Sequence, residues 1–76
     1  FPVNETANLN AANTRLNAGD ADGAKAYLAK AGNSPAAQNA RGVYEALKGN
    51  DQQARHYFGL AAKAGVKAAQ ENLENL

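Results

Sequence analysis

GVYEALKGNDQQARHYFGLAAKAG, residues 42–65, is the stretch of sequence that decides the fold. Its Gly-Asn step at 49–50 separates two segments in which apolar residues recur every three or four positions, as the apolar face of a helix requires. A turn this short makes the two helices antiparallel. The stretch therefore predicts a helical hairpin, with apolar positions Val43, Tyr44 and Leu47 before the turn and Ala54, Tyr57, Phe58 and Ala61 after it.

The same pattern occurs earlier in the chain, in residues 12–32, which read ANTRLNAGDADGAKAYLAKAG. The turn and the apolar positions after it recur 30 residues later: Gly19-Asp20, Ala24, Leu28 and Ala31 return as Gly49-Asn50, Ala54, Phe58 and Ala61. The phrase Ala-Lys-Ala-Gly at 29–32 returns at 62–65, which is a spacing of 33. We therefore expect the helix after the second turn to be about one helical turn longer than its counterpart.

Caps and glycines set the limits of five predicted helices, at about 4–18, 20–31, 34–49, 51–65 and 66–76. Ser34-Pro35 is the clearest start, because Ser accepts from free N–H groups and Pro needs no donor at the first position. Gly32 is expected to close the second helix at C′. The predicted fold class is all-α, a short α-solenoid of two antiparallel helix-turn-helix repeats, at about 4–32 and 34–65, and a C-terminal capping helix at about 66–76.

Composition supports close helix packing in one domain that spans residues 1–76. Of the 34 apolar residues, 19 are Ala, the best helix former, so helices approach through small side chains. A chain of 76 residues lies near the lower limit for a stable core without disulfides or metals. The chain starts at Phe1 and contains no Met, from which we expect a fragment of a longer protein.

Charge and hydropathy argue against two classes of partner. The net charge is +1 and the basic residues are scattered, which disfavours nucleic acid. No stretch is long and apolar enough to predict direct membrane insertion.

The absence of Cys fits both a reducing cytosol and a periplasm. The compartment stays open, with a periplasmic or outer-membrane-associated location favoured over the cytoplasm.

The repeat resembles the tetratricopeptide family. The likeness in repeat two is carried by Gly42, Gly49-Asn50, Ala54, Phe58 and Ala61, and in repeat one by Ala12, Gly19-Asp20, Ala24, Leu28 and Ala31. The segment AAKAGVKAAQ at 61–70 is also similar to Sel1-type repeats. The resemblance implies stacked helical hairpins, whose first helices line a concave groove for a peptide or a partner helix.

The third predicted helix departs from the family pattern. Polar residues Gln38, Arg41 and Glu45 occupy positions where the family has large apolar ones, so we expect this helix to be rotated. Arg41 and Glu45 stand at i and i+4, which predicts a solvated ion pair. The first helix contains four Asn residues, at 8, 10, 13 and 17, and is expected to be the least stable element.

Candidate catalytic and metal-binding residues all have structural explanations. His56 has no convergent partner at helical spacing, and Ser34 has a capping role without a base beside it. Asp20 and Asp22 lack the further ligands of a Ca²⁺ loop. We therefore predict no enzyme activity, catalytic site, cofactor or metal; a small enzyme that uses His56 is the least favoured function.

The predicted function is non-catalytic binding of a protein or peptide. The candidate groove, placed on the family register, consists of Leu9, Asn13, Asn39, Val43 and Ala46. Its amides would bond to an extended peptide backbone, although solvated Asn residues are the simpler explanation. Recognition of a free C-terminus is disfavoured because Ala36 stands where the family has Lys. The alternative is a structural appendage of a larger bacterial envelope or assembly protein, docked on its own chain or on a neighbouring subunit.

Overall fold

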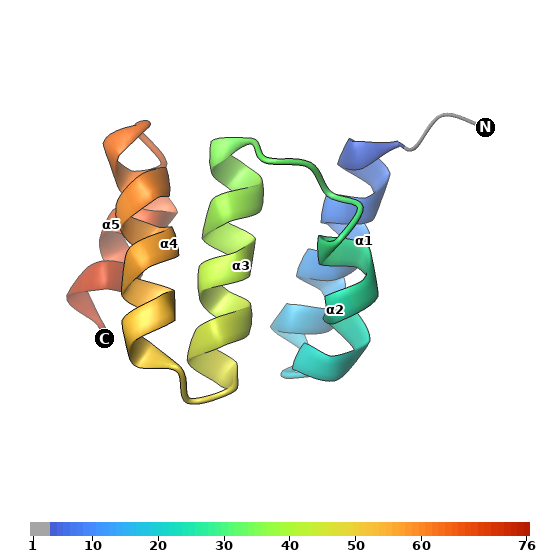
Figure 1. The fold of residues 1–76 in the computed structure, drawn as a ribbon, viewed down its shortest axis with the longest axis horizontal. Helices are drawn as coiled ribbons and strands as arrows, with labels where there is room; N and C mark the ends of the chain where they lie inside the picture. Colours follow the sequence, from blue (N-terminus) through green and yellow to red (C-terminus); the bar gives the residue numbers. More distant parts are fainter. Residues whose placement is uncertain (1–3) are drawn as a thin grey trace.

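Five α-helices and no strand make up residues 4–76, which are the residues that the computed structural model describes. The helices follow one another as antiparallel neighbours (Figure 1). The predicted all-α class and the number of helices are confirmed. Residues 1–3 of the predicted 1–76 domain lie outside the described residues. The helices are α1 (Glu5–Asn17), α2 (Ala21–Leu28), α3 (Pro35–Leu47), α4 (Asp51–Lys63) and α5 (Lys67–Glu74).

Side-chain caps start the first three helices. Asn4 Oδ1 accepts from the Ala7 amide at 2.9 Å, and Asp20 Oδ1 accepts from the Gly23 amide at 2.9 Å. Ser34 Oγ accepts from the Ala37 amide at 3.1 Å, with Pro at the first helical position. Such a bond satisfies one of the donors that every helix leaves free at its N-terminus. Helices α4 and α5 begin without a side-chain cap bond.

Two turns 30 residues apart have the same hydrogen bonds. After α1, the Gly19 amide donates to Leu16 O and the Asp20 amide to Arg15 O; after α3, the Gly49 amide donates to Ala46 O and the Asn50 amide to Glu45 O. Both glycines have positive φ, 76° and 80°, as this way of closing a helix requires. The predicted repeat is therefore also present in the backbone.

Helix α2 ends earlier than the sequence predicts. It stops at Leu28, because the amides of Lys30 and Ala31 bond to carbonyls three residues back and tighten the chain into a turn. Gly32 has φ of 78° but lies beyond the C′ position that we predicted for it. With 13 residues, α4 is longer than the 8-residue α2, which confirms the expected difference.

Helix α3 is the centre of the fold. It packs against α1 and α2 on one side and against α4 on the other, while α5 packs on α4 (Figure 1). The helices thus form an elongated array of 38 × 24 × 16 Å. None of the helices in the described part of the chain is long and apolar enough to cross a membrane.

Small side chains fill two connected cores. The first joins α1, α2 and α3 through Ala12, Leu16, Ala24, Leu28 and Ala40, and the second joins α4 and α5 through Ala54, Phe58, Ala61 and Ala69. Val43 packs against both cores. At Gly42 the backbone of α3 lies so close to α4 that a Cβ atom there would overlap ring carbons Cδ1 and Cε1 of Phe58. The absence of a side chain at 42 therefore sets the α3–α4 distance.

Candidate partner-binding clefts

The structure distributes the five predicted groove residues over two helices. Leu9 packs against the first core from α1, and Asn13 is exposed on the same helix. Val43 and Ala46 of α3 line one cleft, and Asn39 lies one turn before Val43. The α1 residues do not line this cleft.

The cleft that contains Val43 and Ala46 lies between α3 and α5, and we call it the α3–α5 cleft. Its volume is about 250 Å³. Phe58 of α4, which is 2% exposed, closes the base. Leu47 of α3 and Leu76, which follows α5, lie in the lining although they are 46% and 38% exposed. Large apolar side chains with this exposure supply the contact area of protein-binding surfaces.

Five lining residues were not among the predicted groove residues: Leu47, Phe58, Asn72, Asn75 and Leu76. The sequence pattern places Leu47 on the apolar face of its predicted helix. A periodic pattern identifies the face of a helix but not how far along the helix its neighbour extends. The C-terminal part of this face is consequently left exposed.

An amide pair connects α3 and α5 beside this cleft. Asn72 Nδ2 donates to Asn39 Oδ1 at 3.2 Å, and both side chains are half-buried. The two residues are 33 positions apart, the spacing at which the sequence makes them equivalents. Asn39 therefore already has one internal partner.

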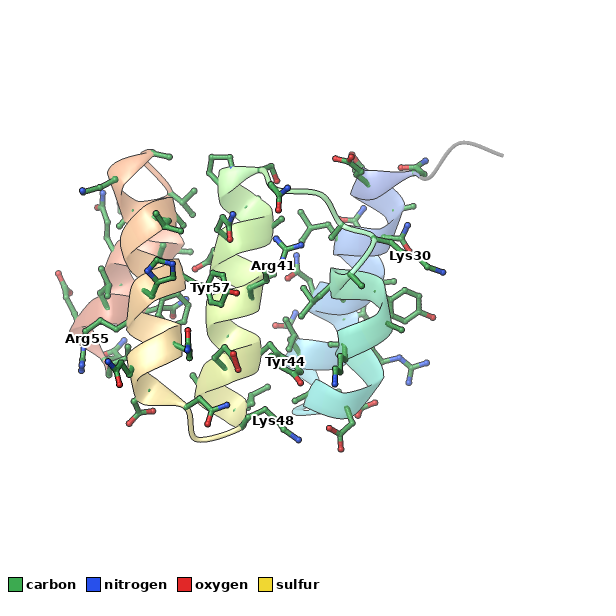
Figure 2. All side chains as sticks on the ribbon, viewed as in Figure 1. Lys30, Arg41, Tyr44, Lys48, Arg55 and Tyr57 are labelled. Carbon is green, nitrogen blue, oxygen red and sulfur yellow. The ribbon has the colours of Figure 1, made fainter. Side chains whose placement is uncertain are left out.

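A second cleft, which we call the Arg41 cleft, lies between α2 and α4 over α3. Its volume is about 180 Å³. Figure 2 shows Arg41, Tyr44 and Tyr57 on the face of the molecule where α2 and α4 are nearest the viewer, with Arg41 and Tyr44 in the space between α3 and α2. The lining consists of Lys25, Leu28, Ala29, Arg41, Tyr44, Glu45 and Tyr57.

The predicted ion pair between Arg41 and Glu45 is wrong. Arg41 Nη2 donates instead to the Leu28 carbonyl at 2.8 Å, and Glu45 Oε1 accepts from Asn50 Nδ2 at 3.1 Å. Leu28 is the last residue of α2, where free carbonyls and the helix dipole attract a cation. The bond from Arg41 satisfies one of the carbonyls that α2 leaves free at its C-terminal end.

A charged contact joins α2 and α3. Lys48 Nζ donates to Asp22 Oδ1 at 2.9 Å. The hydrogen bond and then the attraction of the two charges hold the pKa of Asp22 below its ordinary 3.8 and that of Lys48 above its ordinary 10.5. Both groups are exposed, so the contact adds little to stability.

The residues that the sequence analysis considered for catalysis or metal binding are either exposed or engaged in structural contacts. His56 is exposed, and its ring lies 5.5 Å from that of Tyr57, centroid to centroid. Asp20 and Ser34 cap helices, while Asp22 pairs with Lys48. Within residues 4–76 no three His, Cys, Asp or Glu residues are grouped to hold a metal ion.

The fold and the two clefts define a small all-α protein made of successive helical hairpins. A comparison with known proteins finds no matching family, no matching characterised sequence and no matching solved structure.

Proposed function

We propose that the chain is a non-catalytic protein-binding module of the tetratricopeptide type. In this proposal the α3–α5 cleft receives apolar side chains of a peptide or of a partner helix. The recurrent turns after α1 and α3, and the close approach of Gly42 to Phe58, support the relation to that family. They correspond to the inner turn and to the small and aromatic positions on which the resemblance depends.

The observation that carries this proposal is the exposure of Leu47 and Leu76 in the lining of one cleft. Among the described residues, the exposed large apolar side chains are these two and Leu60. Full burial of an exposed leucine side chain is worth about 1.5–3 kcal/mol. Leu47 and Leu76 are 46% and 38% exposed, so a ligand that covers them gains roughly half of that from each. Asn75 lines the same cleft and provides a polar group for the ligand backbone.

Selection from a displayed library of random peptides tests the proposal directly. The wild-type chain is the bait, and each selected peptide is measured again on Leu47→Asn and Leu76→Asn variants. Because both side chains are exposed, these changes preserve the fold, and we expect affinity to fall about tenfold or more. Leu60→Asn is the matched control, since Leu60 has similar exposure but lies outside this cleft.

Two outcomes would count against the proposal. Peptides that bind all three variants as well as the wild-type chain would place binding elsewhere on the surface. Failure to select any peptide, together with tight docking onto a separate part of a longer parent protein, would favour the structural-appendage alternative.

A further inference from the structure

The guanidinium of Arg41 is held in place by a single hydrogen bond. Its Nη2 is fixed by the Leu28 carbonyl, while its Nη1 is buried and has no hydrogen-bond partner among the described residues. A buried cationic N–H without an acceptor raises the free energy of the folded chain. Binding of a hydrogen-bond acceptor removes this penalty. This nitrogen belongs to a side chain that lines a cleft of about 180 Å³.

The charges in the lining fit a ligand with one negative charge. Lys25 and Arg41 are cations and Glu45 is an anion, which leaves a single positive charge in the Arg41 cleft. Glu45 already accepts a bond from Asn50 and makes no ion pair with Arg41. The negative charge of Glu45 repels a phosphate, which carries nearly two negative charges, more strongly than a carboxylate, which carries one.

The walls of the cleft select the rest of the ligand. Leu28 and Ala29 of α2 and the rings of Tyr44 and Tyr57 provide apolar contact around the charged groups. Such walls suit the methylene groups of a glutamate side chain, whose carboxylate then reaches the guanidinium.

We propose that the Arg41 cleft binds the carboxylate of a glutamate side chain presented by a protein ligand. The Arg41 guanidinium donates the central hydrogen bond, Lys25 contributes attraction from the rim, and the tyrosine rings cover the methylene groups. The Arg41 cleft and the α3–α5 cleft share no lining residue. This proposal is therefore independent of the function proposed above.

Gln38 is the candidate internal partner for Arg41, because residues three apart on a helix are neighbours on its surface. Its Oε1 is the other buried side-chain atom without a partner in the described part of the chain, and it lies three residues before Arg41 on α3. An amide oxygen is uncharged, whereas a carboxylate forms a charge-assisted bond of about twice the strength. A glutamate ligand is therefore expected to be preferred over Gln38.

A solution NMR titration with the blocked dipeptide N-acetyl-leucyl-glutamyl-amide tests this site. We expect the resonances of the Arg41 side chain and of the Tyr44 and Tyr57 rings to shift together, and the shifts to weaken as salt is added. The glutamine dipeptide should bind about tenfold more weakly or worse, because a neutral amide replaces the carboxylate.

Matched variants locate the binding. Lys25→Gln, at an exposed position, should weaken the glutamate dipeptide about twofold to fivefold, and Arg41→Gln about tenfold or more. Arg41→Lys keeps the positive charge but loses the planar guanidinium with its fixed set of N–H donors, so it should also weaken binding. Lys30→Gln and Arg55→Gln are the controls, because Figure 2 shows both side chains on outer sides of the molecule, away from the cleft.

Three results would overturn the proposal. The first is binding of the glutamine dipeptide as tight as that of the glutamate dipeptide. The second is a loss of binding in the control variants as large as that in Lys25→Gln. Equal shifts with acetate at the same concentration would indicate an adventitious ion only.

Discussion

Gly42 is the residue on which the α3–α4 contact depends, and it gives a sharp prediction about stability. In Gly42→Ala the new methyl group meets the Phe58 ring inside the core, so the free energy of unfolding should fall by about 1–3 kcal/mol. Gly59 of α4 is the control, because a Cβ there has open space around it. Gly59→Ala should stabilise by up to about 1 kcal/mol through helix propensity. Urea denaturation measures both, and two changes of the same sign would contradict this account of the contact.

The sequence was informative about residues whose role is local. The caps at Asn4, Asp20 and Ser34 were predictable, because a capping side chain bonds to an amide only three residues away. Arg41 was not predictable in the same way. Its partner is the Leu28 carbonyl, 13 positions away, which becomes available only because α2 ends there.

At the scale of the elements, the contact between Lys48 and Asp22 makes the α2–α3 packing depend on pH. Asp22 has a lowered pKa in the folded chain, so its contribution is present at neutral pH and is lost as pH falls below 3.8 through the folded value. Lys48 has a raised pKa, so its contribution is present below pH 10.5 and is lost as pH rises through the folded value.

NMR titration of the Asp22 carboxyl group checks this contact. The Lys48→Gln variant should return the pKa of Asp22 toward its ordinary value, because both the hydrogen bond and the attraction are removed. Lys63→Gln is the control, as Lys63 is an exposed lysine of α4 that does not contact Asp22. An unchanged pKa in Lys48→Gln would mean that the contact does not persist in solution.

Element boundaries show where sequence patterns stop being informative. The ends of α1 and α3 followed from their Gly turns, whereas α2 ended three residues early, in the segment Ala29 to Ala31. Those residues favour helix, but the chain must turn there to bring α3 against both α1 and α2. The instability expected for the Asn-rich α1 stays a prediction.

On the scale of the whole molecule, Val43 connects the two cores. Val43→Ala should lower the free energy of unfolding by about 1–2 kcal/mol and also lower the urea m-value, because the two halves then unfold less cooperatively. Val66→Ala is the control, since Val66 packs against the second core alone. It should reduce stability without changing the m-value. A normal m-value for Val43→Ala would mean that the cores are coupled by other contacts.

The clefts are also features of the whole molecule. For this reason the sequence predicted only part of their lining. Val43 and Ala46 were proposed as groove residues and lie in one cleft, but Leu9 and Asn13 lie on another part of the array. A cleft depends on the relative positions of three helices, α3, α4 and α5 in this case. Periodicity within a single helix does not contain that information.

The matching turns after Gly19 and Gly49 mean that the length of this protein is adjustable. Both turns close with the same backbone hydrogen bonds, and the Asn39–Asn72 hydrogen bond joins equivalent positions of α3 and α5. A copy of residues 33–65 inserted after Gly65 would therefore meet α4 and α5 through surfaces that the chain already possesses. We therefore expect the chain to accept added hairpins and to form longer arrays, in which each added hairpin contributes a further core.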